Sequence, residues 1–320
     1  MKLTFILILL GLCFVTGCCS ADEGANRNPE SSSGSTPPWN DAVVLPDLTN
    51  AIQFRLYTNA SPDAAHLFNT FEIAAYGEML LSSPEGDGLK RWLATSPTNA
   101  SLHNILVGGT GPQLVATNGM TVIERASGPE WHYIALDAGL AYRDRLEQFR
   151  RGILFVEPDL FVLYDHVVAK EPVSFRMLLH VPAATRLDPV WRDLRLDLPG
   201  AGLRISAPAG HHSLHAWEQI ESATDAFLPN TVTMQLGPTN KLARLDLLNV
   251  FVVCHGGEKK NYAFKLLESN NAVGARIHRD GLPTLVAFKT APSTAKASLT
   301  GFGFTGPVGV SVFKPKQAKR

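Results

Sequence analysis

Short runs of β-branched and aromatic residues, separated by turn-forming residues, recur along most of the chain. The clearest example lies in residues 142–180. Residues 153–157 form a β-rich run, residues 157–160 place Pro158 where a type I turn needs a fixed φ, and residues 161–168 are β-rich again. This pattern predicts a β-hairpin.

The next segment, residues 173–181, alternates strictly between two sets of side chains. One set is Val173, Phe175, Met177 and Leu179, and the other is Ser174, Arg176, Leu178 and His180. Successive side chains of a strand point to opposite faces of its sheet. We therefore predict a third strand, with the apolar set in the core and Arg176 and His180 on the other face.

Similar runs continue on both sides of this region, and no apolar repeat of 3.6 residues is sustained over 15 residues. Runs of this kind occupy residues 51–58, 71–81, 121–123, 131–136, 194–198, 203–206, 231–236, 247–253, 262–267, 284–290 and 308–313. Many short strands with Gly/Pro turns between them are typical of antiparallel sandwiches. The pattern predicts an all-β protein, with a single large antiparallel two-sheet β-sandwich over residues 48–313.

Composition and charge restrict the function classes. Lys and Arg number 29, and Asp and Glu also number 29, so the net charge is zero and no nucleic-acid partner is indicated. Hydrophobic residues make up 45% of the chain, which is enough for a sizeable core.

The N-terminal residues have the layout of a secretory signal. Lys2 is followed by an apolar stretch, residues 3–15, that is too short to span a bilayer. The sequence Val15-Thr16-Gly17-Cys18 resembles a bacterial lipobox, which predicts removal of residues 1–17 and acylation of Cys18. The alternative is an ordinary signal with a chance cysteine. The expected location is the bacterial cell envelope, with lipid anchoring to a membrane.

Two further segments flank the predicted sandwich. Residues 18–47 are rich in Ser, Gly, Pro and Asn and predict a flexible tether. Residues 314–320 form a basic tail.

Five segments occur in an order that is found in a known family. They read FEIAAYGEMLL, LHNILVGG, ALDAGLAY, RRGILFVEPDLFVLYDHV and VSFRMLLH, all between residues 71 and 180. Their order and spacing resemble the C-terminal β-sandwich of the heparinase II/III-like polysaccharide lyases. The resemblance implies a sandwich fold and an acidic, uronate-containing polysaccharide as partner.

This sequence departs from the family in two ways. Full-length members carry an α/α-toroid domain before the sandwich, which supplies most catalytic residues, whereas a tether is expected here. Some members also bind Zn²⁺ through three residues, whose positions fall on Ala65, Ser83 and His103 in this sequence. His103 is the only retained ligand type, and zinc needs three or more good donors, so we expect no metal and no other cofactor.

Polysaccharide lyases cleave by β-elimination, which requires a base, an acid and a stabiliser of enolate-like charge. The candidates for contact with the sugar are His66, Asn69, His103, Asn104, Tyr142, Arg176 and His180. Five of them also have a structural interpretation: His66 could be a surface loop residue, His103 and Asn104 could hold a turn, Tyr142 could pack in the sandwich, and His180 could be a hydrogen-bonded strand residue. The pair Arg150-Arg151 is interpreted as solvated or salt-bridged surface.

Three functions follow as hypotheses. The first is a lipid-anchored sandwich that binds an acidic polysaccharide or assists its processing without being a complete lyase. The second is an active lyase whose site is rebuilt on the sandwich or completed by a separate toroid-domain protein. The third is a structural envelope lipoprotein that contacts other proteins.

Overall fold

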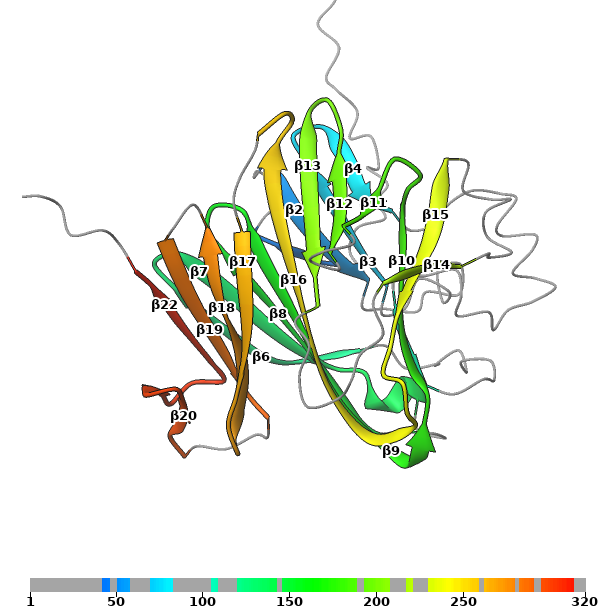
Figure 1. Ribbon diagram of the computed structural model, residues 1–320. Coiled ribbons are helices and arrows are strands. Elements are labelled where there is room, and N and C mark those ends of the chain that lie inside the picture. The colour runs from blue at the N-terminus through cyan, green and yellow to red at the C-terminus, as the bar shows by residue number, and fades with distance from the viewer. Residues whose placement is uncertain are drawn as a thin grey trace, which may run out of the picture. The chain divides into compact units, whose positions relative to one another are not determined.

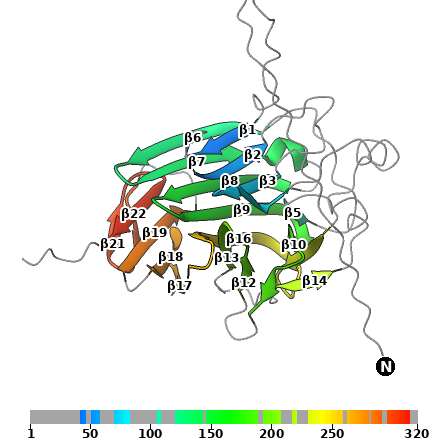
Figure 2. The same ribbon diagram turned by 90° about the horizontal axis from the view of Figure 1, so that it is seen from above.

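The computed structural model describes residues 42–46, 51–57, 70–82, 105–108, 120–142, 146–188, 193–207, 217–220, 230–258, 262–279, 282–290 and 295–313. They all belong to one compact unit, Trp39–Arg320. Within these ranges the chain forms antiparallel β-sheets and one short 3₁₀-helix, η4 (Gly139–Tyr142) (Figures 1 and 2). The prediction of an all-β antiparallel fold is confirmed. No helix in the described part of the chain has the length and apolar character needed to cross a membrane.

An eight-stranded sheet, called here the central sheet, is the framework of the fold. From one edge to the other its strands are β11 (Arg186–Leu187), β12 (Leu194–Asp197), β13 (Ala201–Ser206), β16 (Leu242–His255), β9 (Leu160–Val173), β8 (Leu146–Val156), β7 (Trp131–Asp137) and β6 (Thr121–Gly128). The longest strands, β8, β9 and β16, lie together in the middle.

These middle strands carry continuous apolar runs, for example residues 160–164 in β9 and 250–253 in β16. A strand that is buried on both faces has this pattern. Phe161 and Leu163 enter one core cluster, whereas Leu160 and Val162 enter a second cluster on the opposite face. The central sheet is therefore covered on both sides.

Two smaller sheets cover one face. The N-terminal sheet contains β1 (Ala42–Leu45), β2 (Ile52–Tyr57), β3 (Phe71–Ala75) and β4 (Glu78–Leu81), and the β10 sheet contains β14 (Glu218–Ile220), β15 (Thr231–Leu236), β10 (Phe175–Pro182) and β5 (Ile105–Gly108). Phe54 and Phe71 stack with their ring centroids 5.1 Å apart, and both meet Phe251 of β16 at 6.3 and 5.8 Å. Aromatic packing thus joins the N-terminal sheet to the central sheet.

The C-terminal sheet covers the opposite face. It contains β17 (Tyr262–Glu268), β18 (Ala272–Arg279), β19 (Leu282–Lys289) and β22 (Val308–Val312). The hairpin of β20 (Ala297–Leu299) and β21 (Phe302–Phe304) forms a small third cluster with this sheet. Figure 1 shows β17–β19 and β22 on one side of the long strands, and β2–β4, β10 and β15 on the other. The structure thus adds a third layer to the predicted sandwich, because the middle strands are apolar on both faces.

The predicted hairpin is confirmed. Val156 at the end of β8 pairs with Leu160 at the start of β9, and the peptide bond between Glu157 and Pro158 is cis. The predicted end of the second strand at residue 168 is too early, because β9 continues to Val173 and pairs there with Leu242 of β16.

The third predicted strand is β10, in which Phe175, Met177 and Leu179 are buried as expected, whereas Val173 is the last residue of β9 and is only partly buried. The other face of β10 does not remain open: Arg176 is exposed, but His180 is fully buried. His180 pairs with Thr233 of β15, which is also fully buried, so this end of the strand is covered on both faces. The prediction that Arg176 and His180 share the face opposite the apolar set is confirmed by their spacing in β10, although this face is exposed only at Arg176.

Candidate functional site

The described candidates from the sequence do not meet at one open site. Arg176 is exposed, His180 is buried four residues further along the same strand, and Tyr142 is buried in η4 with its ring 5.2 Å from that of Phe149. The packing interpretation of Tyr142 is confirmed. The other predicted positions lie outside the described residues: Cys18, Ala65, His66, Asn69, Ser83, His103 and Asn104.

Within the described ranges, no group of three or more His, Cys, Asp or Glu side chains is placed to hold a metal ion. The three positions of the zinc motif, Ala65, Ser83 and His103, fall outside those ranges.

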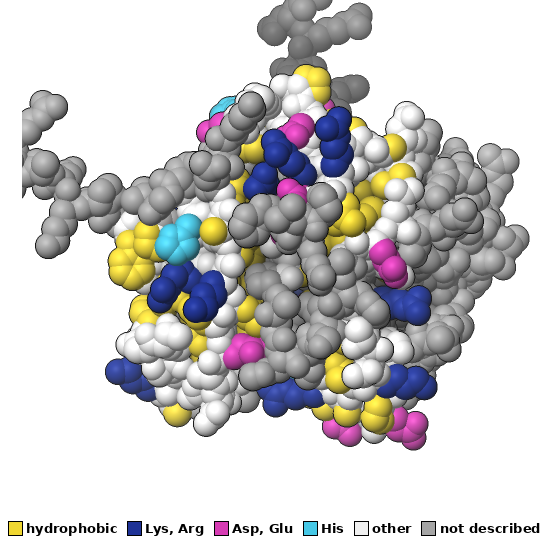
Figure 3. All heavy atoms as spheres, in the orientation of Figure 1, with side chains coloured by type: hydrophobic (Ala, Val, Ile, Leu, Met, Phe, Trp, Pro, Cys, Tyr) yellow, Lys and Arg dark blue, Asp and Glu magenta, His cyan; other side chains and the backbone are white. Residues whose placement is uncertain are grey.

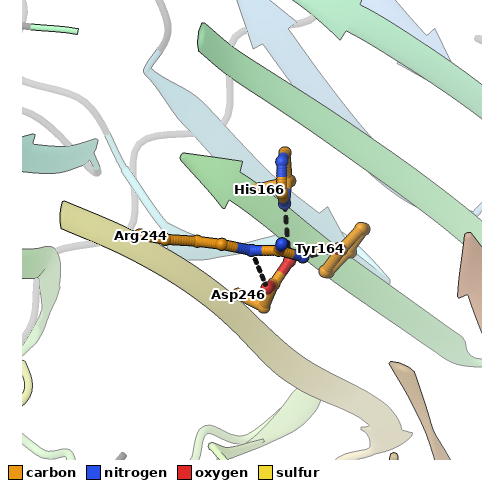
Figure 4. A network of polar contacts seen from close by, with 4 residues as sticks. All are labelled: Tyr164, His166, Arg244 and Asp246. Carbon is orange, nitrogen blue, oxygen red and sulfur yellow. Dashed lines mark hydrogen bonds and ion pairs between the residues drawn. The ribbon is translucent and has the colours of Figure 1, made fainter. Parts of the chain in front are cut away.

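A polar network lies on the face of the central sheet that carries the C-terminal sheet (Figure 4). His166 of β9 and Asp246 of β16 are register partners, with His166 Nδ1 2.6 Å from Asp246 Oδ1. The Tyr164 hydroxyl donates to the same oxygen at 2.5 Å. Arg244 Nε donates to the other carboxylate oxygen at 3.0 Å. One carboxylate therefore accepts from three side chains on two neighbouring strands.

The members of this network differ in exposure. The side chains of His166 and Asp246 are 7% and 18% exposed, whereas that of Arg244 is 55% exposed. Tyr164 is buried, and its ring stacks on Phe288 of β19 at 5.1 Å. The network thus runs from the interface with the C-terminal sheet out to solvent at Arg244.

Burial and hydrogen bonding set the protonation states of two members. Burial raises the pKa of Asp246, but hydrogen bonds from His166 and Tyr164 and the charges of His166 and Arg244 outweigh it, so the pKa lies below its ordinary value. Burial, together with the neighbouring Asp246 carboxylate, raises the pKa of the Tyr164 hydroxyl. Asp246 is therefore a carboxylate that only accepts, and Tyr164 is a neutral donor.

This charge state also selects the histidine tautomer. Because the Asp246 carboxylate has no proton to donate, His166 Nδ1 carries the proton of their hydrogen bond. In the neutral imidazole, Nε2 then keeps its lone pair. A carboxylate that holds an imidazole in this way is an arrangement suited to general acid–base chemistry.

A second polar group lies beside this network on β8, where Arg150 is the register partner of His166. Arg150 Nη2 donates to Glu124 of β6 at 2.7 Å and lies 3.5 Å from the Tyr133 hydroxyl. Tyr133 reaches this position across Gly152, where an added Cβ would lie 3.1 Å from the Tyr133 ring and hydroxyl. Burial raises the pKa of Tyr133 to about 12.

The neighbouring Arg151 points to the opposite face of the central sheet. Its Nε and Nη2 donate to the two carboxylate oxygens of Asp165 at 2.7 and 2.8 Å, and neither side chain is exposed. The guanidinium also lies 5.7 and 5.4 Å from the ring centroids of Phe71 and Phe149. Both arginines form salt bridges, as one of the two interpretations expected, but their placement at the surface is wrong, because both faces of β8 are covered by other sheets.

The sequence carries one sign of this network. Tyr164, Asp165 and His166 interrupt an otherwise apolar strand, and polar residues in such a strand need partners. The partner Asp246 lies 80 residues further along the chain, and nothing local identifies it.

Solved structures of heparan sulfate lyases resemble this fold. A mutant of heparan sulfate lyase HepC from Pedobacter heparinus matches with a TM-score of 0.59 and 14% identity, over 78% of this chain and 41% of that one. A second HepC structure from the same organism, which is not described as a mutant, matches with a TM-score of 0.56 and 14% identity, over 76% of this chain and 40% of that one. A heparinase III structure matches with a TM-score of 0.54 and 15% identity, over 74% and 39%.

No family model matches the sequence, and no curated protein is similar enough to count as a relative. The chain spans about two fifths of the length of the lyases it resembles. At this level of identity the likeness concerns the fold, and the chain has the β-sandwich fold found in part of heparinase III.

Proposed function

We propose that this chain binds an acidic, uronate-containing polysaccharide and assists its processing. The observation that carries this proposal is the likeness of three quarters of the chain to structures named as heparan sulfate lyases. Because the chain spans about two fifths of those proteins, complete lyase activity is not part of the proposal. A separately encoded toroid-domain protein is the proposed partner for cleavage.

The proposal extends to location. The N-terminal sequence supports export and acylation at Cys18, which would hold the sandwich at a membrane of the cell envelope. Metabolic labelling with a fatty acid tests this part, and a Cys18→Ser variant that still carries the label would contradict it.

Binding can be measured directly by titration calorimetry with the purified protein. Heparan sulfate and an unsulfated uronate polymer are the ligands, and neutral dextran is the control. We expect saturable binding to at least one acidic polymer and none to dextran. Absence of binding to every acidic polymer tested would overturn the proposal.

A second candidate function is β-elimination at the polar network. It is favoured by His166, which Asp246 holds through Nδ1, with the Tyr164 hydroxyl and the Arg244 guanidinium beside the same carboxylate. In this reaction the proton next to the uronate carboxylate leaves and a carbon–carbon double bond forms. The neighbouring glycosidic C–O bond breaks, and its oxygen takes up a proton. His166 would exchange the proton, and Arg244 would bind the carboxylate.

The ultraviolet absorbance of the unsaturated product reports this reaction. The His166→Gln variant should abolish any activity of the wild type, whereas His132→Gln should not, because the His132 side chain is 42% exposed and lies 3.9 Å from Glu157, away from Asp246. If the wild type forms no unsaturated product, either alone or with a toroid-domain protein, the second candidate fails while the binding proposal stands.

A further inference from the structure

Basic side chains gather on the outer face of the C-terminal sheet, away from the polar network. Lys265 of β17 and Arg276 of β18 are register partners, and both are exposed. His278 lies two residues further along β18 on the same face and is partly exposed. The alternate residues Ala275 and Ile277 point inward to the core. Figure 3 shows Lys or Arg side chains together with a histidine over β17 and β18.

Among the described residues, the positions that flank these cations on the outer face contain no carboxylate. Strand pairing places two rows of side chains on this face. The first row contains Lys265, Arg276, Leu285 and Ser311, and the second contains Ala263, His278 and Pro283. Phe313 lies next to the second row, because its backbone N–H donates to the Pro283 carbonyl at 3.1 Å. Like charges directly opposite each other on neighbouring strands are destabilising. The side chains of Lys265, Arg276 and His278 have no hydrogen-bond or ion-pair partner among the described residues. An anion from outside the chain would relieve this repulsion.

The same face carries an exposed aromatic ring. Phe313 follows β22 and is 51% exposed, the largest exposure among the large hydrophobic residues of the described ranges. It lies in the row of His278, beside Pro283. Exposed aromatic rings offer an apolar face to the C–H groups of a sugar, while neighbouring cations bind carboxylate or sulfate groups.

A second row of cations on the central sheet provides a contrast. Arg186, Arg195 and Arg204 are successive register partners on β11, β12 and β13. Here two of the three charges have partners, because Arg195 Nε donates to Asp197 at 2.9 Å and Arg204 lies over the Tyr262 ring at 5.8 Å. The repulsion in this row is therefore largely compensated within the protein.

We propose that Lys265, Arg276, His278 and Phe313 form a binding surface for an anionic glycan chain. The cations bind its carboxylate or sulfate groups, and Phe313 packs against a sugar ring. This inference rests on the proposed function and adds the place on the fold where the acidic polysaccharide is held.

The geometry favours a chain over a single small anion. Neighbouring strands lie about 5 Å apart, and residues two apart along a strand lie about 7 Å apart, so the three cations spread over more than one charged group. A nucleic acid is the competing polyanion, since its affinity comes largely from phosphate contacts. The likeness of the fold to structures of heparan sulfate lyases favours the glycan, since a net charge of zero over the whole sequence attracts neither polyanion.

The test compares a double variant with a control of equal charge change. Lys265→Ser with Arg276→Ser should weaken binding to heparan sulfate by about tenfold, because two charge-assisted contacts are lost. It should also make the affinity less dependent on salt. Arg186→Ser with Arg195→Ser removes the same charge from the compensated row and should leave the affinity within about twofold of the wild type. We expect both variants to retain the fold, because all four side chains are at least partly exposed. Thermal unfolding of both variants checks this.

Phe313→Ser separates sugar stacking from electrostatics. It should lower the affinity while leaving its salt dependence unchanged, because no charge is altered.

Wild-type affinity in the Lys265/Arg276 double variant, or equal losses in both double variants, would overturn the proposed surface. Equally tight binding of a single-stranded DNA of matched charge would overturn its assignment to glycan. If the wild type binds no acidic polymer, the proposed function itself fails, whereas wild-type binding with an unaffected double variant rejects this surface alone.

Discussion

Arg151 and Asp165 are register partners on β8 and β9, and their side chains form two hydrogen bonds without any solvent exposure. Removing one partner of such a pair leaves the other charge buried. We expect Arg151→Ala to lower the free energy of unfolding by about 3–5 kcal/mol. Replacing both partners by apolar residues, as in Arg151→Met with Asp165→Leu, should cost much less. Urea unfolding of both variants measures this, and a double variant as unstable as the single one would contradict the argument.

Asp246 should contribute stability that is lost in acid. Its pKa is lowered in the folded protein, so the contribution is fully present above the unfolded pKa of about 4 and is lost as the pH falls through the lower folded pKa. Asp246→Asn should cost about 2 kcal/mol at neutral pH, because the neutral amide is a weaker acceptor for Tyr164, His166 and Arg244.

The matched control is Asp197→Asn, whose side chain is 57% exposed and pairs with Arg195. It should change stability by less than about 1 kcal/mol. Unfolding curves from neutral to acid pH compare the two variants. An acid dependence that is as steep in Asp246→Asn as in the wild type would contradict the assignment.

Tyr133 should make the protein sensitive to alkali. Its pKa is raised to about 12, so above the unfolded pKa of about 10 the unfolded chain releases a proton that the folded chain retains. Stability should therefore fall as the pH rises from about 10 towards 12. Tyr133→Phe should reduce this fall, as measured by urea unfolding across this range. An unchanged slope in the variant would show that Tyr133 is not the responsible group.

Phe161 should be among the costly positions of the core. Its ring lies 5.5 Å from that of Phe54 and 4.8 Å from that of Phe155, and it is fully buried. Phe161→Ala should lower the free energy of unfolding by about 3–5 kcal/mol, because it leaves a cavity between two sheets. Phe313→Ala, at an exposed position, should change it by less than about 1 kcal/mol. Equal effects would contradict the described packing.

Much of the fold could be predicted from local pattern. The alternation in residues 173–181 marked a strand, Pro158 marked the hairpin turn, and the order of five segments indicated a lyase-type sandwich. The continuous apolar runs in β9 and β16 also carried the information that both faces are buried, although the expected sandwich had two sheets.

The candidate site could not be predicted in the same way. Arg150 and Arg151 are adjacent in the sequence but enter different ion pairs on opposite faces of β8. His166 meets Asp246 because β9 pairs with β16 in one register.

The sequence by itself determined where strands form, because side-chain propensity and a period of two act over a few residues. The tertiary structure decided which strands lie beside each other and which faces are covered. The two-residue period shows which side chains share a face of one strand. The partner of such a side chain on a neighbouring strand or sheet is set by long-range packing. For this reason only the tertiary structure identified the acidic partner of His166 and the basic surface at Lys265 and Arg276.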